Sequence, residues 1–172
     1  MKPLGPIPAG FSTSGGELAI SGRAARMLAE VAGDTPLFVY SGDLITARVA
    51  RLRAAMPPRL AIHYAVKANP YQPILEFMRN LVDGFDVASD GELARVMEAG
   101  VAPGQVSFAG PGKRDREIRP AVEAGVTINV ESLAEANRAV AVGEALDVLP
   151  RLAVRVNPDF VLRGSGMKMG AG

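Results

Sequence analysis

The chain has 172 residues, of which 48% are hydrophobic and 22% charged, and its formal net charge is +1 at pH 7. This length allows one domain with a hydrophobic core, and this composition argues against intrinsic disorder. The basic residues are scattered along the chain, so the sequence shows no electrostatic footprint for nucleic acid.

The residue types exclude further classes of site. The chain has no cysteine and one histidine, so we expect no disulfide, no thiolate metal site and no histidine-rich metal cluster. No apolar run approaches membrane-spanning length, and the N-terminus shows proline and glycine in place of a signal-peptide core. We therefore expect a soluble cytoplasmic protein that binds neither nucleic acid nor membrane.

The N-terminal part is expected to be irregular at first. Residues 1–16 are rich in proline, glycine and serine and predict an extended arm. The following pattern predicts a strand, a helix, a strand and a helix at 17–20, 23–31, 37–40 and 43–55. We expect residues 1–33 to form an arm and a helix that precede the main domain.

From residue 60 onward, strands and helices alternate. Strands are expected near 60–67, 84–88, 106–109, 126–131 and 151–156, and helices near 71–81, 90–99, 114–124 and 132–146. The strand ends recur about every 20–25 residues, which is the spacing of βα units in a parallel sheet. Ser89 with Glu92, and Ser132 with Glu135, have the spacing of a capping box at a helix start.

Alternate residues of these strands differ in character. One face is bulky and apolar: Phe85, Val87, Val106, Phe108, Val126, Ile128, Val130, Leu152, Val154 and Val156. The other face is small or polar: Ala65, Lys67, Gly84, Asp86, Ala88, Ser107, Ala109, Thr127, Asn129, Glu131, Ala153 and Arg155. A sheet covered by helices on both sides has two apolar faces, whereas a barrel that holds a polar ligand can have a polar interior.

The pattern therefore predicts an α/β fold with a parallel (β/α) barrel of the TIM type. Lys67, Asp86 and Arg155 are expected to point inward near the carboxyl ends of the strands, where active sites of such barrels lie. A closed barrel of this type has eight strands, and about five or six are found here. We thus expect residues 34–172 to form a truncated, partial barrel.

The lysine at position 67 is the strongest candidate for chemistry. It follows the strand-like run His-Tyr-Ala-Val at 63–66, and its face of that strand is lined by alanine. Desolvation at such a position favours the neutral amine, which is a nucleophile able to form a Schiff base. The alternative is a lysine that reaches solvent at a strand end.

Four segments carry a family resemblance. Residues 64–69, Tyr-Ala-Val-Lys-Ala-Asn, resemble the pyridoxal-phosphate lysine motif of the fold-type III decarboxylases, which include the ornithine and diaminopimelate decarboxylases. Residues 85–93, 108–113 and 155–158 resemble three further motifs of that family, in the family's order. The segments at 1–8 and 164–170 are similar to one subgroup, the decarboxylases associated with the exosortase A system.

The resemblance implies an alanine racemase-like barrel, pyridoxal 5'-phosphate as cofactor and decarboxylation of an α-amino acid. It implies that Lys67 forms the Schiff base and that Asp86 and Arg155 bind the cofactor beside it. It also implies a homodimer for the full-length form. Compared with full-length members, the chain is expected to be an N-terminal fragment that lacks the C-terminal β domain and is inactive alone.

Several alternatives stay open. The protein could be an amino-acid racemase, a non-catalytic pyridoxal-phosphate-binding barrel or an inactive gene fragment. Asp86 could serve only as a buried salt-bridge partner, and Arg155 could form an interior ion pair with Asp86 or Glu131. Residues 110–113, Gly-Pro-Gly-Lys, could cradle an anion or form an ordinary βα loop. His63 is expected to lie in the barrel interior without contacting a ligand.

Overall fold

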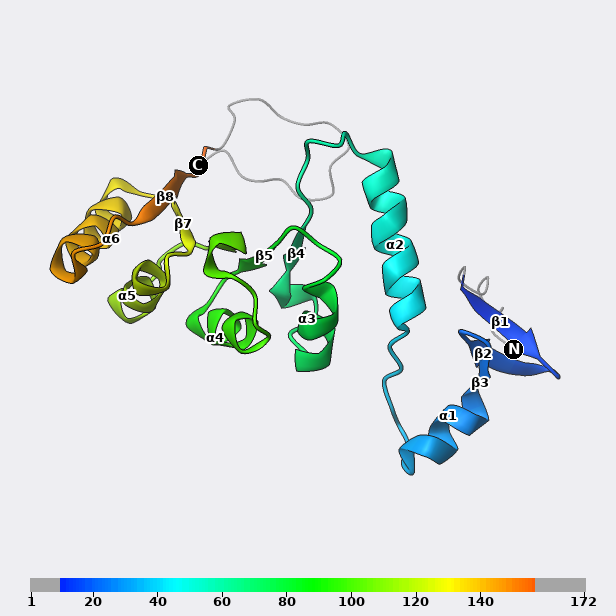
Figure 1. Cartoon of the computed structure of the whole chain (residues 1–172). Coiled ribbons are helices and arrows are strands. Elements are labelled where there is room, and N and C mark those ends of the chain that lie inside the picture. Colours follow the sequence, from blue (N-terminus) through cyan, green and yellow to red (C-terminus); the bar gives the residue numbers. More distant parts are fainter. Residues whose placement is uncertain (1–9, 157–172) are drawn as a thin grey trace. The chain divides into compact units, whose positions relative to one another are not determined.

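The computed structural model of the chain describes residues 10–156, which divide into two compact units between Leu60 and Ala61 (Figure 1). The first unit contains three antiparallel strands: β1 (Phe11–Ser14), β2 (Glu17–Ile20) and β3 (Arg23–Ala24). Two helices follow them: α1 (Ala25–Ala32) and α2 (Gly42–Ala55). The helix predicted at 23–31 therefore begins two residues later, and Gly33 caps its end.

Residues 11–14 correct the prediction of an extended arm, because they pair with β2 along their whole length. Gly15 and Gly16 connect the two strands with φ angles of 59° and 81°. Two successive residues with positive φ are typical of the tight hairpin turns that match the twist of antiparallel strands. The glycine-rich composition of this region thus indicates a hairpin turn.

The strand predicted at 37–40 is wrong. The segment Leu-Phe-Val-Tyr is not part of any strand, and all four of its large side chains are exposed, with Phe38 at 90%. A strand exists only where a neighbouring strand completes its hydrogen bonds, and no strand among residues 10–156 pairs with this segment. Its apolar composition alone therefore did not determine its structure.

The second unit consists of the predicted βα repeats. Its strands are β4 (His63–Ala65), β5 (Gly84–Val87), β6 (Val106–Phe108), β7 (Thr127–Val130) and β8 (Arg151–Val154). Its helices are α3 (Gln72–Met78), α4 (Asp90–Glu98), α5 (Asp115–Ala124) and α6 (Leu133–Leu146). Two short 3₁₀ turns, η1 (Val66–Ala68) and η2 (Pro103–Gln105), complete it. The predicted elements from residue 60 onward are confirmed, with ends that shift by a few residues.

The five strands are all parallel and lie side by side in chain order. Right-handed crossovers between sequential parallel strands place every helix on the same side of the sheet. Figure 1 shows α3 to α6 in a row along one side of the strands. This one-sided arrangement is that of a barrel wall, whereas a doubly wound sheet has helices on both sides.

The two faces of the sheet differ as predicted. Phe85, Val106, Phe108 and Ile128 are at most 1% exposed and form the core with the helices. The register pairs Ala65 with Asp86, and Asp86 with Ser107, so these small and polar residues share the opposite face, which we call the open face. At β8 the apolar face is covered less, because Leu152 and Val154 are exposed.

The predicted capping boxes form with one variation. Ser89 and Ser132 each accept a hydrogen bond from the backbone N–H of the glutamate three residues later, at 3.2 Å. Each glutamate then accepts from the residue before the serine: Glu92 from Ala88 and Glu135 from Glu131. Each cap therefore ties a helix start to the carboxyl end of the preceding strand.

Among residues 10–156, no helix combines the length and apolar character that crossing a membrane requires. The segments at 1–8 and 164–170, on which the subgroup resemblance depends, and Asn157 and Pro158 of the fourth motif, lie outside the described residues.

The assigned core of the second unit can be tested by truncating one of its buried side chains. Replacing the fully buried Ile128 by alanine removes apolar contacts and leaves a cavity, so the free energy of unfolding should fall by about 2–5 kcal/mol. Leu149→Ala is the matched control, because Leu149 is 94% exposed and its truncation should change stability by less than about 0.5 kcal/mol. Urea unfolding followed by circular dichroism measures both; equal effects would contradict the assigned core.

Candidate functional site

Lys67 does not lie in the strand itself. The strand β4 ends at Ala65, and Val66–Ala68 form a 3₁₀ turn that carries the exposed Lys67 beyond the sheet. The Tyr64 hydroxyl donates to the carbonyl of Asn69, at 3.1 Å, and the Asn69 N–H donates to the carbonyl of Val66, also at 3.1 Å. These hydrogen bonds end the strand earlier than its strand-like sequence predicts, and they hold the lysine at the carboxyl end of β4.

Asp86 lies on the open face of the neighbouring strand β5, beside the single histidine. The Asp86 Oδ1 atom is 3.5 Å from His63 Nδ1, and the two side chains are 48% and 35% exposed. Gly84 allows this approach, because a Cβ atom there would lie 2.6 Å from the imidazole ring of His63. The partner of Asp86 is therefore His63. Because Asp86 is half-exposed, it does not match the alternative of a buried salt-bridge partner.

The open face is filled by short side chains above this pair. Asn129 donates through Nδ2 to the hydroxyl of Ser107, at 2.6 Å, so β6 and β7 are linked across the face. Ala88 and Ala109 lie two residues after Asp86 and Ser107, and Ala153 pairs with Asn129; none of the three alanines is buried. The positions that follow Asp86 and Ser107 on this face therefore carry short side chains.

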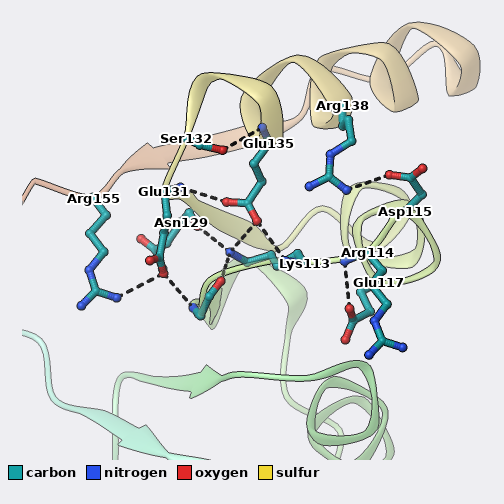
Figure 2. Close-up of polar contacts among 11 residues, drawn as sticks. Lys113, Arg114, Asp115, Glu117, Asn129, Glu131, Ser132, Glu135, Arg138 and Arg155 are labelled. Carbon is teal, nitrogen blue, oxygen red and sulfur yellow. Dashed lines mark hydrogen bonds and ion pairs between the residues drawn. The ribbon is translucent and has the colours of Figure 1, made fainter. Parts of the chain in front are cut away.

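Arg155 follows β8 and contacts Glu131, which follows β7. The Arg155 Nη1 atom donates to Glu131 Oε1 at 3.1 Å, and the side chains are 32% and 20% exposed. The same Oε1 atom accepts the backbone N–H of Gly110 at 3.2 Å (Figure 2). One carboxylate oxygen thus joins the carboxyl ends of three neighbouring strands, and the ion pair of Arg155 with Glu131 was one of the open alternatives.

A buried ion pair lies next to this contact. Lys113 is 4% exposed and Glu135 is 3% exposed, and Lys113 Nζ lies 3.4 Å from Glu135 Oε1. The ammonium also donates to the carbonyls of Gly110, at 2.8 Å, and Asn129, at 2.7 Å, and it lies 5.6 Å from the centre of the Phe108 ring. The sequence does not reveal this pair: it places Glu135 in a capping box and Lys113 at the end of a motif, without indicating that the two side chains meet.

These contacts decide how residues 110–113 are used. An ammonium group has three hydrogens, and here three oxygen atoms of the chain surround it. The backbone N–H of Lys113 also donates to Glu135 Oε1, at 3.2 Å. The ammonium of Lys113 therefore points into the protein. Residues 110–113 form a βα loop that is held by the hydrogen bonds of Lys113 to Gly110, Asn129 and Glu135. No group of three His, Cys, Asp or Glu within residues 10–156 could hold a metal ion.

Comparisons with known proteins agree with the motifs. The family model described as "Pyridoxal-dependent decarboxylase, pyridoxal binding domain" matches residues 42–169. Diaminopimelate decarboxylase of Aquifex aeolicus is 39% identical over 84% of this chain and 34% of its own length. The enzyme of the same name from Pseudomonas aeruginosa is 41% identical over 87% of the chain and 36% of its own length. The chain spans about a third of the length of these curated relatives.

Solved structures show the same relationship. A crystal structure from Aquifex aeolicus superposes with a TM-score of 0.80 at 36% identity, over 87% of this chain and 37% of that one. Diaminopimelate decarboxylase from M. jannaschii gives 0.76 at 30% identity, over 87% and 36%. The predicted fold class is thereby confirmed: the five parallel strands are part of an alanine racemase-like (β/α) barrel.

The contribution of the Lys113–Glu135 pair to stability can be tested by substitution. Lys113→Met should lower the free energy of unfolding by about 3–5 kcal/mol, because it leaves the Glu135 carboxylate buried without its cation. The matched control is Arg138→Gln, which breaks the exposed pair of Arg138 on α6 with Asp115 at the start of α5, two residues after Lys113, and should cost at most about 1 kcal/mol. Urea unfolding measures both, and similar losses would show that Lys113 is not part of a buried pair.

Proposed function

Because the chain belongs to the pyridoxal-binding domain family of the pyridoxal-dependent decarboxylases, we propose that it forms the cofactor-binding part of an amino-acid decarboxylase of fold-type III. The observation that carries this proposal is the combined position of Lys67, exposed at the carboxyl end of β4, and of the half-exposed Asp86 on the neighbouring strand. In this proposal residues 34–172 are the partial barrel domain, whose described strands lie between His63 and Val154, and residues 1–33 precede it.

The residues at this end of the sheet fit pyridoxal phosphate. Lys67 supplies an exposed amine for covalent attachment on a short turn after β4, and the half-exposed Asp86 lies on the neighbouring strand. When bound, the cofactor withdraws electrons from the α-carbon of an amino acid, so that the α-carboxylate can leave as CO₂. The protein supplies the orientation of the groups around that carbon.

Asp86 and Arg155 have separate roles in this proposal. Asp86 presents an acceptor beside the lysine, and His63, at 3.5 Å, orients its carboxylate. Arg155 presents a planar fork of donors that suits an anionic or phenolic oxygen of the cofactor, with Glu131 holding one of its nitrogens. Lys67 is then the residue placed to donate or accept a proton near the reacting carbon.

The substrate class follows from the relatives. Curated relatives decarboxylate diaminopimelate or, in Niallia circulans, an L-glutamyl group on an acyl-carrier protein. Solved relatives were crystallised with L-lysine and with putrescine. We infer an α-amino acid as substrate. The exosortase A-associated subgroup, a homodimer and a cytoplasmic location are finer parts of the proposal, and they rest on the resemblance alone.

The attachment site can be tested sharply, because the chain has four lysines: Lys2, Lys67, Lys113 and Lys168. Incubation with pyridoxal phosphate, reduction with borohydride and peptide mapping should place the label on Lys67, since in this proposal Asp86 and Arg155 hold the cofactor near its amine. Lys113 is the internal control, because its ammonium is buried and should stay unlabelled. Equal labelling of Lys2, Lys67 and Lys168 would contradict a specific site.

The two other predicted residues should affect affinity. Asp86→Ala and Arg155→Ala should each weaken the equilibrium affinity for pyridoxal phosphate about 10- to 100-fold, because each removes a hydrogen bond that involves a charged group. Absorbance titration of the bound cofactor gives the dissociation constant. Asp115→Ala is the control, because Asp115 begins α5 and pairs with Arg138 away from the open face. An unchanged affinity in either test variant would remove that residue from the site.

A further inference from the structure

Glu131 is a charged residue at the strand ends to which the preceding proposal gives no direct part in cofactor binding. It follows β7, its side chain is 20% exposed, and its Oε1 atom receives two hydrogen bonds. One comes from the Gly110 N–H, at the start of the loop after β6, and the other from Arg155 Nη1, after β8. The carboxylate therefore links the two neighbouring strand ends through one atom.

The backbone beneath this carboxylate is held on both sides. The Glu131 N–H donates to Glu135 Oε2 at 2.9 Å, so the first turn of α6 holds the Glu131 backbone at the end of β7. The carbonyl of Gly110 accepts from Lys113 Nζ, and that ammonium is paired with the same Glu135. Figure 2 shows Glu131 between Arg155 on one side and the Lys113–Glu135 pair on the other. The backbone of Gly110, whose N–H donates to Glu131, and the backbone of Glu131 itself are thus both hydrogen-bonded to the Lys113–Glu135 pair.

Arg155 needs such an anchor. Its side chain is long and one-third exposed, so an unrestrained guanidinium would populate several rotamers and lose entropy on binding a ligand. A carboxylate that already holds one nitrogen of the fork reduces this cost and turns the planar group to a defined orientation. The carboxylate is itself restrained by a buried network, which makes the orientation reproducible.

We propose that Glu131 is a positioning residue of the cofactor site, which orients the Arg155 guanidinium toward pyridoxal phosphate from a base fixed by the buried Lys113–Glu135 pair. The inference rests on the proposed function, because it requires Arg155 to contact the cofactor. It goes beyond that function, because it assigns a role to a residue that touches Arg155 and the loop after β6.

A double-mutant cycle on the full chain tests this role. Glu131→Gln keeps an oxygen that can accept the Gly110 N–H but removes the charge that holds Arg155. The dissociation constant for pyridoxal phosphate should rise about tenfold when Arg155 is present, and by less than about twofold in an Arg155→Ala background. A residue that only stabilised the fold would weaken binding equally in both backgrounds. Arg138→Gln, in the same helix as Glu135, should leave the dissociation constant unchanged.

A second measurement does not depend on the cofactor. In the cofactor-free chain, amide hydrogen exchange at Gly110 should be about tenfold faster, or more, in Glu131→Ala, because the acceptor of that N–H is lost. Glu131→Gln should keep the protection. Unchanged exchange in Glu131→Ala would overturn the contact itself.

The outcomes separate the two proposals. If the unmodified chain shows no specific label at Lys67, the proposed function fails, and the role of Glu131 toward the cofactor fails with it. If Lys67 is labelled but Glu131→Gln binds the cofactor as tightly as the unmodified chain, only the inference about Glu131 is overturned. Equal losses in both Arg155 backgrounds would overturn it as well, since they would show a general structural effect.

Discussion

The sheet of β4 to β8 has one face that is shielded from water, and the other features of this unit depend on that constraint. Phe85, Phe108 and Ile128 are buried beneath the helices because sequential parallel strands with right-handed crossovers place all helices on one side. Among the described residues of this unit, no helix covers the opposite face, so its side chains can be short or polar. Hydrophobic burial thereby determines where the polar chemistry of this unit is located.

The charged groups at the strand ends divide into two kinds by their exposure. Lys113 and Glu135 are buried, and desolvation of such charges is compensated only when hydrogen bonds surround them. Their function is therefore internal, namely to hold the loop after β6 against the start of α6. Asp86 and Arg155 keep part of their surface in water and can exchange that water for a ligand. A buried pair that fixes the backbone next to partly exposed groups is an arrangement that preorganises a binding site.

Much of this architecture was predictable from the sequence, because parallel βα units leave a strong alternation of apolar and polar positions. The segment at 37–40 shows the limit: its residues favour a strand, but a strand also needs a partner, which composition does not reveal. The sequence predicts a role for Lys67 from its place after a strand-like run and from its motif, whereas the turn that carries Lys67 depends on hydrogen bonds of Tyr64 and Asn69. The pairing of Lys113 with Glu135 depends on strand register and rotamers, which periodicity does not encode.

The polar contacts of the open face and strand ends follow one spacing. The pairs Ser107–Asn129, Gly110–Glu131, Lys113–Glu135 and Glu131–Arg155 are separated by 21 to 24 residues, which is one βα unit. In these pairs, a polar group of one βα unit forms a hydrogen bond with a polar group of the next unit, so neighbouring strand ends are linked through side chains. Because these links connect only adjacent units, the loss of one contact should act mainly on the two strand ends that share it. Glu131 belongs to two such links, so its substitution reaches three strand ends.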